Sequence, residues 1–316
     1  MRRFAQYETI SVGCRSTAFQ EWPMYTIQEL IELLINIRKL PTLGPVVLML
    51  ERTLNEDEPE VGQVSRIIAD DPPTTSMILK LANSVMYGSR RTIATVNEAV
   101  VRLGFKEVRK MVVDVSLVKY VASMPKGLLD PIRYWQHSIA VAICMEELQS
   151  RNKIMDENGP QAHVVGLLHD IGRLITATHL PEIHQNLPVE IIEGENDEKI
   201  IEIERDRIGL DHAQIGAAVL ERWGLPLQIV NCVRFHHEPD VCPKELRKVT
   251  YLLHLSDCIC RSAAVGDTGE GPPQKINDRI WEILGVPPES KAEITVAVAE
   301  KVKMSEVMLT IGGLKD

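Results

Sequence analysis

The feature that most constrains this chain is the spacing of its apolar residues, which recur at helical intervals along almost its whole length. After Thr26, for example, Leu30, Ile31, Leu34 and Ile37 fall on one face of a helix. Long alternating runs of β-branched and aromatic residues between turn signals, the pattern of half-buried strands, are scarce. We therefore predict an all-α fold.

Start and stop signals divide this pattern into short helices. Thr26-Ile-Gln-Glu29 and Thr95-Val-Asn-Glu98 are capping boxes, in which the Thr hydroxyl and the Glu carboxylate satisfy backbone amides at a helix start. Gly104 falls where a left-handed residue would separate two helices. The expected helices span about 44–54, 61–69, 74–84, 95–104, 106–121, 131–149, 161–176, 196–208, 211–223, 226–237, 243–261, 276–284 and 290–309.

The length and the breaks in the pattern predict more than one unit. A chain of 316 residues suits two domains, and its 45% hydrophobic and 25% charged composition is typical of globular proteins. Residues 123–127 interrupt the helices, and Asp130-Pro131 starts the next one. We expect an N-terminal extension over 1–24, a helical subdomain over 25–124, a second helical domain over 125–263, and a linker with C-terminal helices over 264–316.

Charge and hydropathy narrow the partners and the location. A net charge of -9 argues against direct nucleic-acid binding, which depends on Lys and Arg at phosphates. No apolar signal-peptide run follows the basic N-terminus, and no segment reaches the roughly 18 apolar residues of a membrane span. We expect a cytoplasmic protein without membrane contact. The six cysteines form no Cys-x-x-Cys pair, so zinc ribbons and thioredoxin-type motifs are excluded.

Basic residues gather beside Gly104. Arg102, Lys106, Arg109 and Lys110 either form a patch for an acidic or phosphorylated partner or line a solvated helix face. The second interpretation is favoured, because charges on helices usually face water.

Histidines and aspartates in the second half of the chain indicate a metal site. His169-Asp170 follows the apolar run Val164–Leu168, on the inner side of a predicted buried helix. A buried imidazole beside a carboxylate is stabilised either by a mutual hydrogen bond or by a divalent cation. Taken alone, this doublet does not decide between the two.

The metal interpretation rests on the number of histidines and aspartates at similar positions in the predicted helices. His212 follows the expected N-cap Asp211, the doublet His236-His237 closes a helix, and Asp257 lies in an apolar helix. Adjacent residues on a helix point about 100° apart, so a doublet can reach two neighbouring metals, or one metal and a substrate. The seven candidate ligands are His137, His169, Asp170, His212, His236, His237 and Asp257.

Two known families share these motifs. His137, His169-Asp170-Ile-Gly-Arg173, His212, Phe235-His236-His237-Glu-Pro239 and Leu255-Ser-Asp257 resemble, in the same order, the HD superfamily of metal-dependent phosphohydrolases. Upstream, Leu40-Pro41-Thr-Leu, Asp71-Pro72, Leu81-Ala-Asn83-Ser84 and Ala99-Val-Val-Arg-Leu-Gly104 resemble the HDOD domain, an output module of bacterial signalling proteins. The resemblance covers about residues 40–261 and implies an N-terminal helical HDOD subdomain packed on an HD-type metal-binding domain.

The resemblance implies two metal ions. His137, His169, Asp170 and Asp257 would hold one ion, and Asp170 would bridge to a second at the remaining three histidines, residues 212, 236 and 237. Nitrogen and oxygen ligands without thiolate suit divalent transition metals, with Fe or Mn favoured over Zn or Ni, and the histidine content disfavours Mg and Ca. Arg173 is either a phosphate-binding group or a surface ion-pair partner.

The sequence leaves two functions open. It resembles the HD-GYP phosphodiesterases, but no Gly-Tyr-Pro element follows His237, and Arg173 stands where that group carries lysine. The favoured hypothesis is a bacterial signal-transduction protein that binds a signalling partner. The alternative is a metal-dependent phosphohydrolase acting on a nucleotide or another phosphoester. His163, His179, His184 and His254 have no place in the family pattern and are expected to be structural.

Overall fold

A computed structural model describes residues 44–315 apart from 57, 88–90, 124–128, 153, 155–160, 180–196 and 266–275. Every regular element in these ranges is a helix, which confirms the all-α prediction. The expected helix after Thr26, the N-terminal extension, the boundary near 124–125 and most of the linker lie outside the described residues. Within the described ranges, no helix combines the length and the hydropathy needed to cross a membrane.

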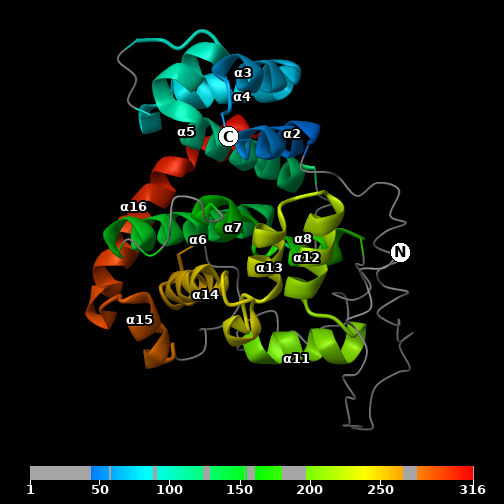
Figure 1. The fold of residues 1–316 in the computed structure, drawn as a ribbon, viewed down its shortest axis with the longest axis vertical. Coiled ribbons are helices and arrows are strands. Elements are labelled where there is room, and N and C mark those ends of the chain that lie inside the picture. The colour runs from blue at the N-terminus through cyan, green and yellow to red at the C-terminus, as the bar shows by residue number, and fades with distance from the viewer. Residues whose placement is uncertain are drawn as a thin grey trace.

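The first group of helices packs around one long helix (Figure 1). Its apolar faces meet in a core that includes Leu50, Ile68, Ile78 and Met111. The elements are α2 (Pro45–Leu54), α3 (Val61–Ala69), α4 (Pro72–Ala82), the short 3-10 helix η1 (Val85–Tyr87) and α5 (Val96–Ala122).

The long helix α5 contains the break that the sequence predicts. Gly104 has φ 80° and ψ 165°, so two helical segments meet there at a kink. Thr95 caps the first segment by accepting a hydrogen bond from the Glu98 amide, 3.1 Å away. The Glu98 carboxylate reaches back to the amide of Ala94 rather than to that of Thr95, a variant of the expected capping box.

Three of the four basic residues beside Gly104, namely Arg102, Arg109 and Lys110, form ion pairs with carboxylates. Arg109 is buried, and its guanidinium donates two hydrogen bonds of 2.7 Å to the Glu51 carboxylate on α2. Lys110 reaches Glu107 and Glu146, at 3.0 and 3.1 Å. The solvated-face interpretation is therefore wrong for Arg109, because α2 covers this side of α5. Neither the composition nor the spacing of the sequence indicates that contact.

The second group carries the candidate ligands and lies below the first in Figure 1. α6 packs on α7 and α14, and α12 packs on α8 and α13, so that these helices surround a common interior. The elements are α6 (Pro131–Asn152), α7 (Ala162–Leu168), α8 (Ile171–His179), α11 (Asp197–Ile208), α12 (His212–Arg222), α13 (Leu227–Arg234), η2 (Pro239–Val241) and α14 (Arg247–Ser262).

Two predicted helices are shorter than the sequence indicates. The helix expected over 161–176 is interrupted at His169-Asp170, where a turn separates α7 from α8. The helix expected over 226–237 ends at Arg234, so His236 and His237 lie in the following turn. Apolar periodicity continues through both turns, because the residues on either side are buried in the same core.

The C-terminal helices return to both groups. In Figure 1, α16 (Lys291–Ser305) runs upward along the second group, where it packs on α6, and α17 (Val307–Ile311) ends on α4 and α5. α15 (Asp278–Leu284) and η3 (Pro288–Ser290) precede them, with α15 packed on α14. Val298, Met308 and Leu309 are buried in these contacts, so the C-terminal helices join the two groups.

Candidate metal centre

The structure brings the seven predicted ligands together from five parts of the chain. His137 comes from the middle of α6, His169 and Asp170 from the turn between α7 and α8, and Asp257 from α14. The others are His212 at the start of α12 and the doublet His236-His237 after α13. Six of the seven are at most 3% exposed, and His237 is half-buried. The centre is therefore enclosed by the helices that supply it.

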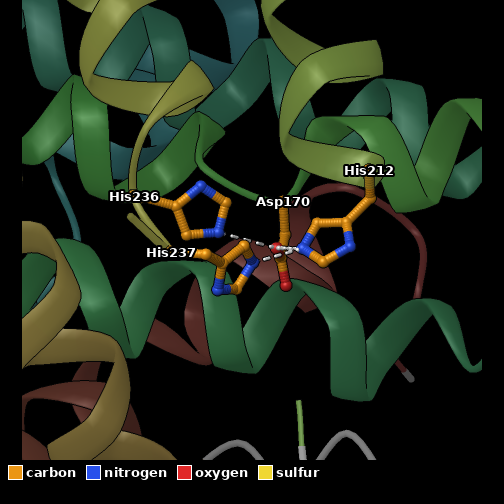
Figure 2. A group of neighbouring side chains, drawn as sticks. All are labelled: Asp170, His212, His236 and His237. Carbon is orange, nitrogen blue, oxygen red and sulfur yellow. Dashed lines mark hydrogen bonds and ion pairs between the residues drawn. The ribbon is translucent and has the colours of Figure 1, made fainter. Parts of the chain in front are cut away.

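The ligand atoms fall into two groups. His137, His169 and Asp257 form one, here called the three-ligand group, and its atoms lie within 4.8 Å of one another. Asp170 with the three remaining histidines, residues 212, 236 and 237, forms the four-ligand group, within the same limit. Figure 2 shows the four-ligand group, in which the imidazoles face the Asp170 carboxylate. The resemblance assigns Asp170 to both ions, whereas this grouping by distance places it with the three histidines.

Asp170 lies between the two groups, with one oxygen toward each. Its Oδ1 is 3.3 Å from His212 Nε2 and 3.8 Å from His236 Nε2 (Figure 2). Its Oδ2 is 3.5 Å from His169 Nε2 and 3.9 Å from His137 Nε2. A carboxylate placed in this way can serve two cations, one at each oxygen.

Hydrogen bonds behind three of the histidines fix which nitrogen faces the centre. The Nδ1 atoms of His169 and His236 lie 2.8 and 2.7 Å from the carbonyl oxygens of Gly166 and Val233. Because a carbonyl only accepts, each Nδ1 carries the proton, and each Nε2 keeps its lone pair. The ring of His212 is oriented in the same sense, with its Nδ1 2.7 Å from the Glu204 carboxylate. This is the arrangement of ligand histidines at metal centres.

Several polar atoms at the centre are buried without a hydrogen bond. Among the described residues, the Nε2 atoms of His137, His169 and His236 have no hydrogen-bond partner, nor do Oδ1 of Asp170 and Oδ1 of Asp257. His137 Nε2 and Asp257 Oδ1 are 3.2 Å apart but lack hydrogen-bond geometry. An unsatisfied buried polar atom costs about 1–3 kcal/mol. Divalent cations would satisfy all five atoms, so the donor set fits a metal centre.

Charge balance keeps the carboxylates ionised. Burial raises the pKa of Asp170, but the charge of Arg173 and the neighbouring His212 outweigh it and hold that pKa well below its usual range. Burial likewise raises the pKa of Asp257, and Arg261 with His137 lowers it further than burial raises it. Both aspartates are therefore anionic and available as ligands.

The histidines at the centre differ in proton affinity. Burial, together with the neighbouring His169, lowers the pKa of His236 to about 3, and burial lowers the pKa of His169 as well. Burial and Arg173 also act to lower the pKa of His212, but Glu204 and Asp170 outweigh them and raise it to about 9. His236 and His169 are thus neutral at neutral pH, as metal ligands must be.

Arg173 belongs to the interior, so its alternative role as a surface ion-pair partner is wrong. It is 6% exposed, and its Nε lies 3.3 Å from Asp170 Oδ2. One turn of α8 separates the two residues, which places the guanidinium at the edge of the centre.

Gly172 brings α8 into direct contact with α12. A Cβ atom at this position would lie 1.9 Å from the His212 carbonyl oxygen and 2.8 Å from the Gly216 amide nitrogen. Only glycine permits this approach, since both neighbouring atoms belong to the backbone. The contact sets the separation between Asp170, in the turn just before α8, and His212, at the start of α12.

Two supporting residues are missed by the sequence analysis. Glu204 on α11 contacts His212, and His254 on α14 has its Nδ1 2.8 Å from the carbonyl oxygen of His236. His254 is structural, as expected, but the structure that it supports is a candidate ligand. Glu204 lies in a highly charged stretch, and no local signal marks it among the other glutamates.

The fold and the site define an all-helical domain that encloses a histidine-aspartate centre. A family model of the HDOD domain matches residues 40–239. The chain therefore belongs to the HDOD domain family. An uncharacterized protein of Treponema pallidum (strain Nichols) is 21% identical over 262 residues, which cover 82% of this chain and 48% of that protein. The chain thus spans about half the length of this relative.

Solved structures share the fold. An HDOD domain protein of unknown function from Geobacter sulfurreducens has a TM-score of 0.68 at 24% identity, covering 87% of this chain and 99% of its own. A Shewanella amazonensis SB2B protein, provisionally named a phosphohydrolase, has a TM-score of 0.63 at 22% identity, covering 87% and 97%. A Marinobacter aquaeolei VT8 protein, provisionally named a signal transduction protein, has a TM-score of 0.69 at 21% identity, covering 92% and 63%.

Proposed function

We propose that this protein is a bacterial signal-transduction regulator whose second helical group holds two divalent transition-metal ions. His137, His169 and Asp257 would hold one ion, the three histidines of the four-ligand group would hold the other, and Asp170 would bridge them. The observation that carries the proposal is the set of buried nitrogen and oxygen atoms without hydrogen bonds that converge there. All ligands are nitrogen or oxygen, which suits divalent transition metals, and of these we propose Fe or Mn over Zn or Ni.

The burial of the centre supports a regulatory role. A hydrolase must admit its substrate to the metal, whereas six of these seven residues are at most 3% exposed. Ions bound there would link α6, the turn before α8, α12, the turn after α13, and α14. Metal binding would thereby stabilise one arrangement of these helices by mass action. The first helical group, α2 to α5, would then present the surface for a signalling protein.

The alternative is a metal-dependent phosphohydrolase acting on a nucleotide or another phosphoester. The observation in its favour is Arg173, whose guanidinium lies 3.3 Å from Asp170 and offers a planar fork for phosphate oxygens. Two bound metals would supply a nucleophilic water of lowered pKa and hold the phosphate. His237 is the half-buried member of the four-ligand group, and a substrate would approach the centre beside it. The provisional name of the Shewanella amazonensis protein points the same way.

Metal content tests the proposal first. We expect untagged protein to contain about two equivalents of Fe or Mn by elemental mass spectrometry, as its two ligand groups predict. The Asp170→Ala variant should lose both, because it removes the bridging carboxylate. Asp114→Asn is the matched control, since Asp114 is a buried carboxylate beside a histidine but outside the centre. Wild-type protein that folds and binds no metal would refute the binuclear centre.

A hydrolysis assay separates the two functions. Metal-loaded protein is incubated with bis(p-nitrophenyl) phosphate and with a panel of cyclic and linear nucleotides. Turnover that disappears in both Asp170→Ala and Arg173→Ala would establish the phosphohydrolase. Loaded protein without turnover, whose unfolding temperature nevertheless rises with metal, would favour the regulator.

A further inference from the structure

One carboxylate outside the seven candidate ligands controls the orientation of His212. Glu204 is 6% exposed, and its Oε2 accepts a hydrogen bond of 2.9 Å from the His212 backbone amide. The same oxygen lies 2.7 Å from His212 Nδ1. Two contacts from one oxygen fix the backbone and the ring of His212 together. The imidazole is left with its Nε2 toward Asp170.

This support differs from that of the other ligands. His169 and His236 are oriented by carbonyl groups three residues earlier in their own segments. His212 is oriented by a residue of another helix, α11, eight positions earlier in the chain. The orientation of His212 therefore depends on whether α11 is docked.

Arg205, the next residue of α11, forms ion pairs with residues on two sides of the four-ligand group. Arg205 donates to Asp211 Oδ2 from Nε at 2.9 Å, and its Nη2 lies 2.7 Å from the same oxygen. Its Nη1 lies 2.8 Å from Glu238 Oε1. Asp211 is the N-cap of the helix that begins with His212, and Glu238 follows the histidine doublet. Adjacent residues of α11 thus contact both ligand-bearing segments.

Polar contacts carry much of the attachment of α11. Eight of its twelve residues are charged, which limits the apolar surface that it can bury. Ile200 and Ile201 are buried, but they are not part of the main hydrophobic core formed by the other helices. The docking of α11 is consequently sensitive to the state of Glu204, Arg205 and their partners at the centre.

We propose that Glu204 is the positioning residue of the four-ligand group and that metal occupancy of this group and docking of α11 favour each other. The inference rests on the proposed metal centre. A carboxylate that holds the far nitrogen of a ligand histidine typically contributes 10–100-fold to metal affinity. Coupling between two equilibria is reciprocal. The factor by which docking of α11 raises metal affinity at His212 is therefore also the factor by which bound metal stabilises the docked helix.

The first test uses calorimetry to measure the affinity of the metal-stripped protein for Mn²⁺. In Glu204→Ala, we expect one of two equivalents to weaken by about 10–100-fold and the other to remain within about 2-fold. Glu204→Gln should be intermediate, because its amide oxygen still accepts the two hydrogen bonds but carries no charge. Glu202→Ala is the matched control, an exposed glutamate of the same helix, and should bind like wild type.

The second test reads out α11 itself. Amide hydrogen exchange over 197–208 should slow on Mn²⁺ addition in wild type and in Glu202→Ala, and it should respond little in Glu204→Ala. If Glu204 had a purely structural role, Glu204→Ala would lower the unfolding temperature with and without metal. It would then not weaken the binding of one metal equivalent in particular, and residues 197–208 would still exchange more slowly when Mn²⁺ is added.

The outcomes distinguish this inference from the metal centre. Wild type that binds no Mn²⁺ refutes the centre, and the inference with it, before any variant is compared. Wild type that binds two equivalents, with Glu204→Ala unchanged in both, overturns the inference alone. If the alanine variant does not fold, Glu204→Gln decides: unchanged affinity together with a metal response of α11 equal to wild type overturns it.

Discussion

Two buried clusters of histidine and carboxylate lie in the part of the chain that the structure describes, and they differ in how the histidine nitrogens are used. In the first, His163 on α7 has its Nε2 2.7 Å from Asp114 and its Nδ1 3.4 Å from Glu146. In the second, His169 and His236 use Nδ1 for a backbone carbonyl, and their Nε2 atoms have no hydrogen bond among the described residues. Burial is common to both clusters, whereas a ring nitrogen without a hydrogen bond distinguishes His169 and His236 from His163.

The two clusters also differ in proton affinity. Burial lowers the pKa of His163, but Asp114 and Glu146 outweigh it and raise that pKa to about 9. At the centre, burial and His169 lower the pKa of His236 to about 3. At neutral pH His163 therefore holds a proton between two carboxylates. At the candidate centre His236 is neutral, and His212, held by Glu204 and Asp170, is the member that keeps a proton.

The largest expected effect comes from separating α8 and α12, which disrupts the centre and leaves the His163 cluster in place. In Gly172→Ala, the new methyl group would meet the backbone of His212 at 1.9 Å. We expect a loss of about 3 kcal/mol in unfolding free energy, measured by urea denaturation, together with loss of metal from the four-ligand group.

Gly62→Ala is the matched control for this change. A Cβ atom at Gly62 on α3 would have no neighbour within 4 Å. Its unfolding free energy should change by less than about 1 kcal/mol, with metal content as in wild type. Equal behaviour of the two variants would contradict the close approach of α8 and α12.

The next effect is a pH dependence that belongs to the His163 cluster. Its folded pKa, about 9, exceeds the ordinary value of 6.5, so folded protein retains a proton that unfolded protein releases between these values. Stability from this group is complete below pH 6.5 and is lost as pH rises through 9. The shift corresponds to about 3 kcal/mol.

His163→Gln isolates this contribution. The difference in unfolding free energy between wild type and variant should shrink from pH 6 to pH 9.5, when both are measured without metal. The other charged groups at this cluster, Lys110 and Glu146, are common to both proteins. A difference that stays constant across this range would show that His163 is not protonated in the folded state.

The smallest effect is a stabilisation by metal that belongs to the centre alone. At free Mn²⁺ ten times its dissociation constant, each bound ion should add about 1.4 kcal/mol to the unfolding free energy. His163→Gln should keep this gain, because its side chain lies outside the centre, and His236→Ala should lose the part due to the four-ligand group. If His163→Gln lost the stabilisation by Mn²⁺, metal binding would not be confined to the centre, and the distinction between the two clusters would be wrong.

Local signals in the sequence were enough for most helices. The helix over Val61–Ala69 has the predicted bounds, Asp211 caps the helix that starts at His212, and Gly104 adopts the positive φ that its position predicts. These features depend on residues close in the chain, where periodicity, caps and glycine act through contacts within one or two turns.

The candidate site was predicted as a set of residues but not as a geometry. The order of the motifs selects all seven candidates that converge, and their role as ligands remains a prediction. The placement of His169-Asp170 and His236-His237 on helices was wrong, because turns carry both doublets. His169 is the C-cap of α7 and keeps helical backbone angles, so this doublet lies at the end of a helix and not in its middle.

The sequence by itself determined the helical class, most helix positions and the identity of the residues that meet. Only the tertiary structure decided that Arg109 is buried against Glu51, that Gly172 touches the backbone of His212, and that Glu204 supports the same histidine. Periodicity states which face of a helix is buried but not which helix covers it. Which helices pack together depends on contacts between segments far apart in the chain, and short-range sequence patterns do not encode these contacts.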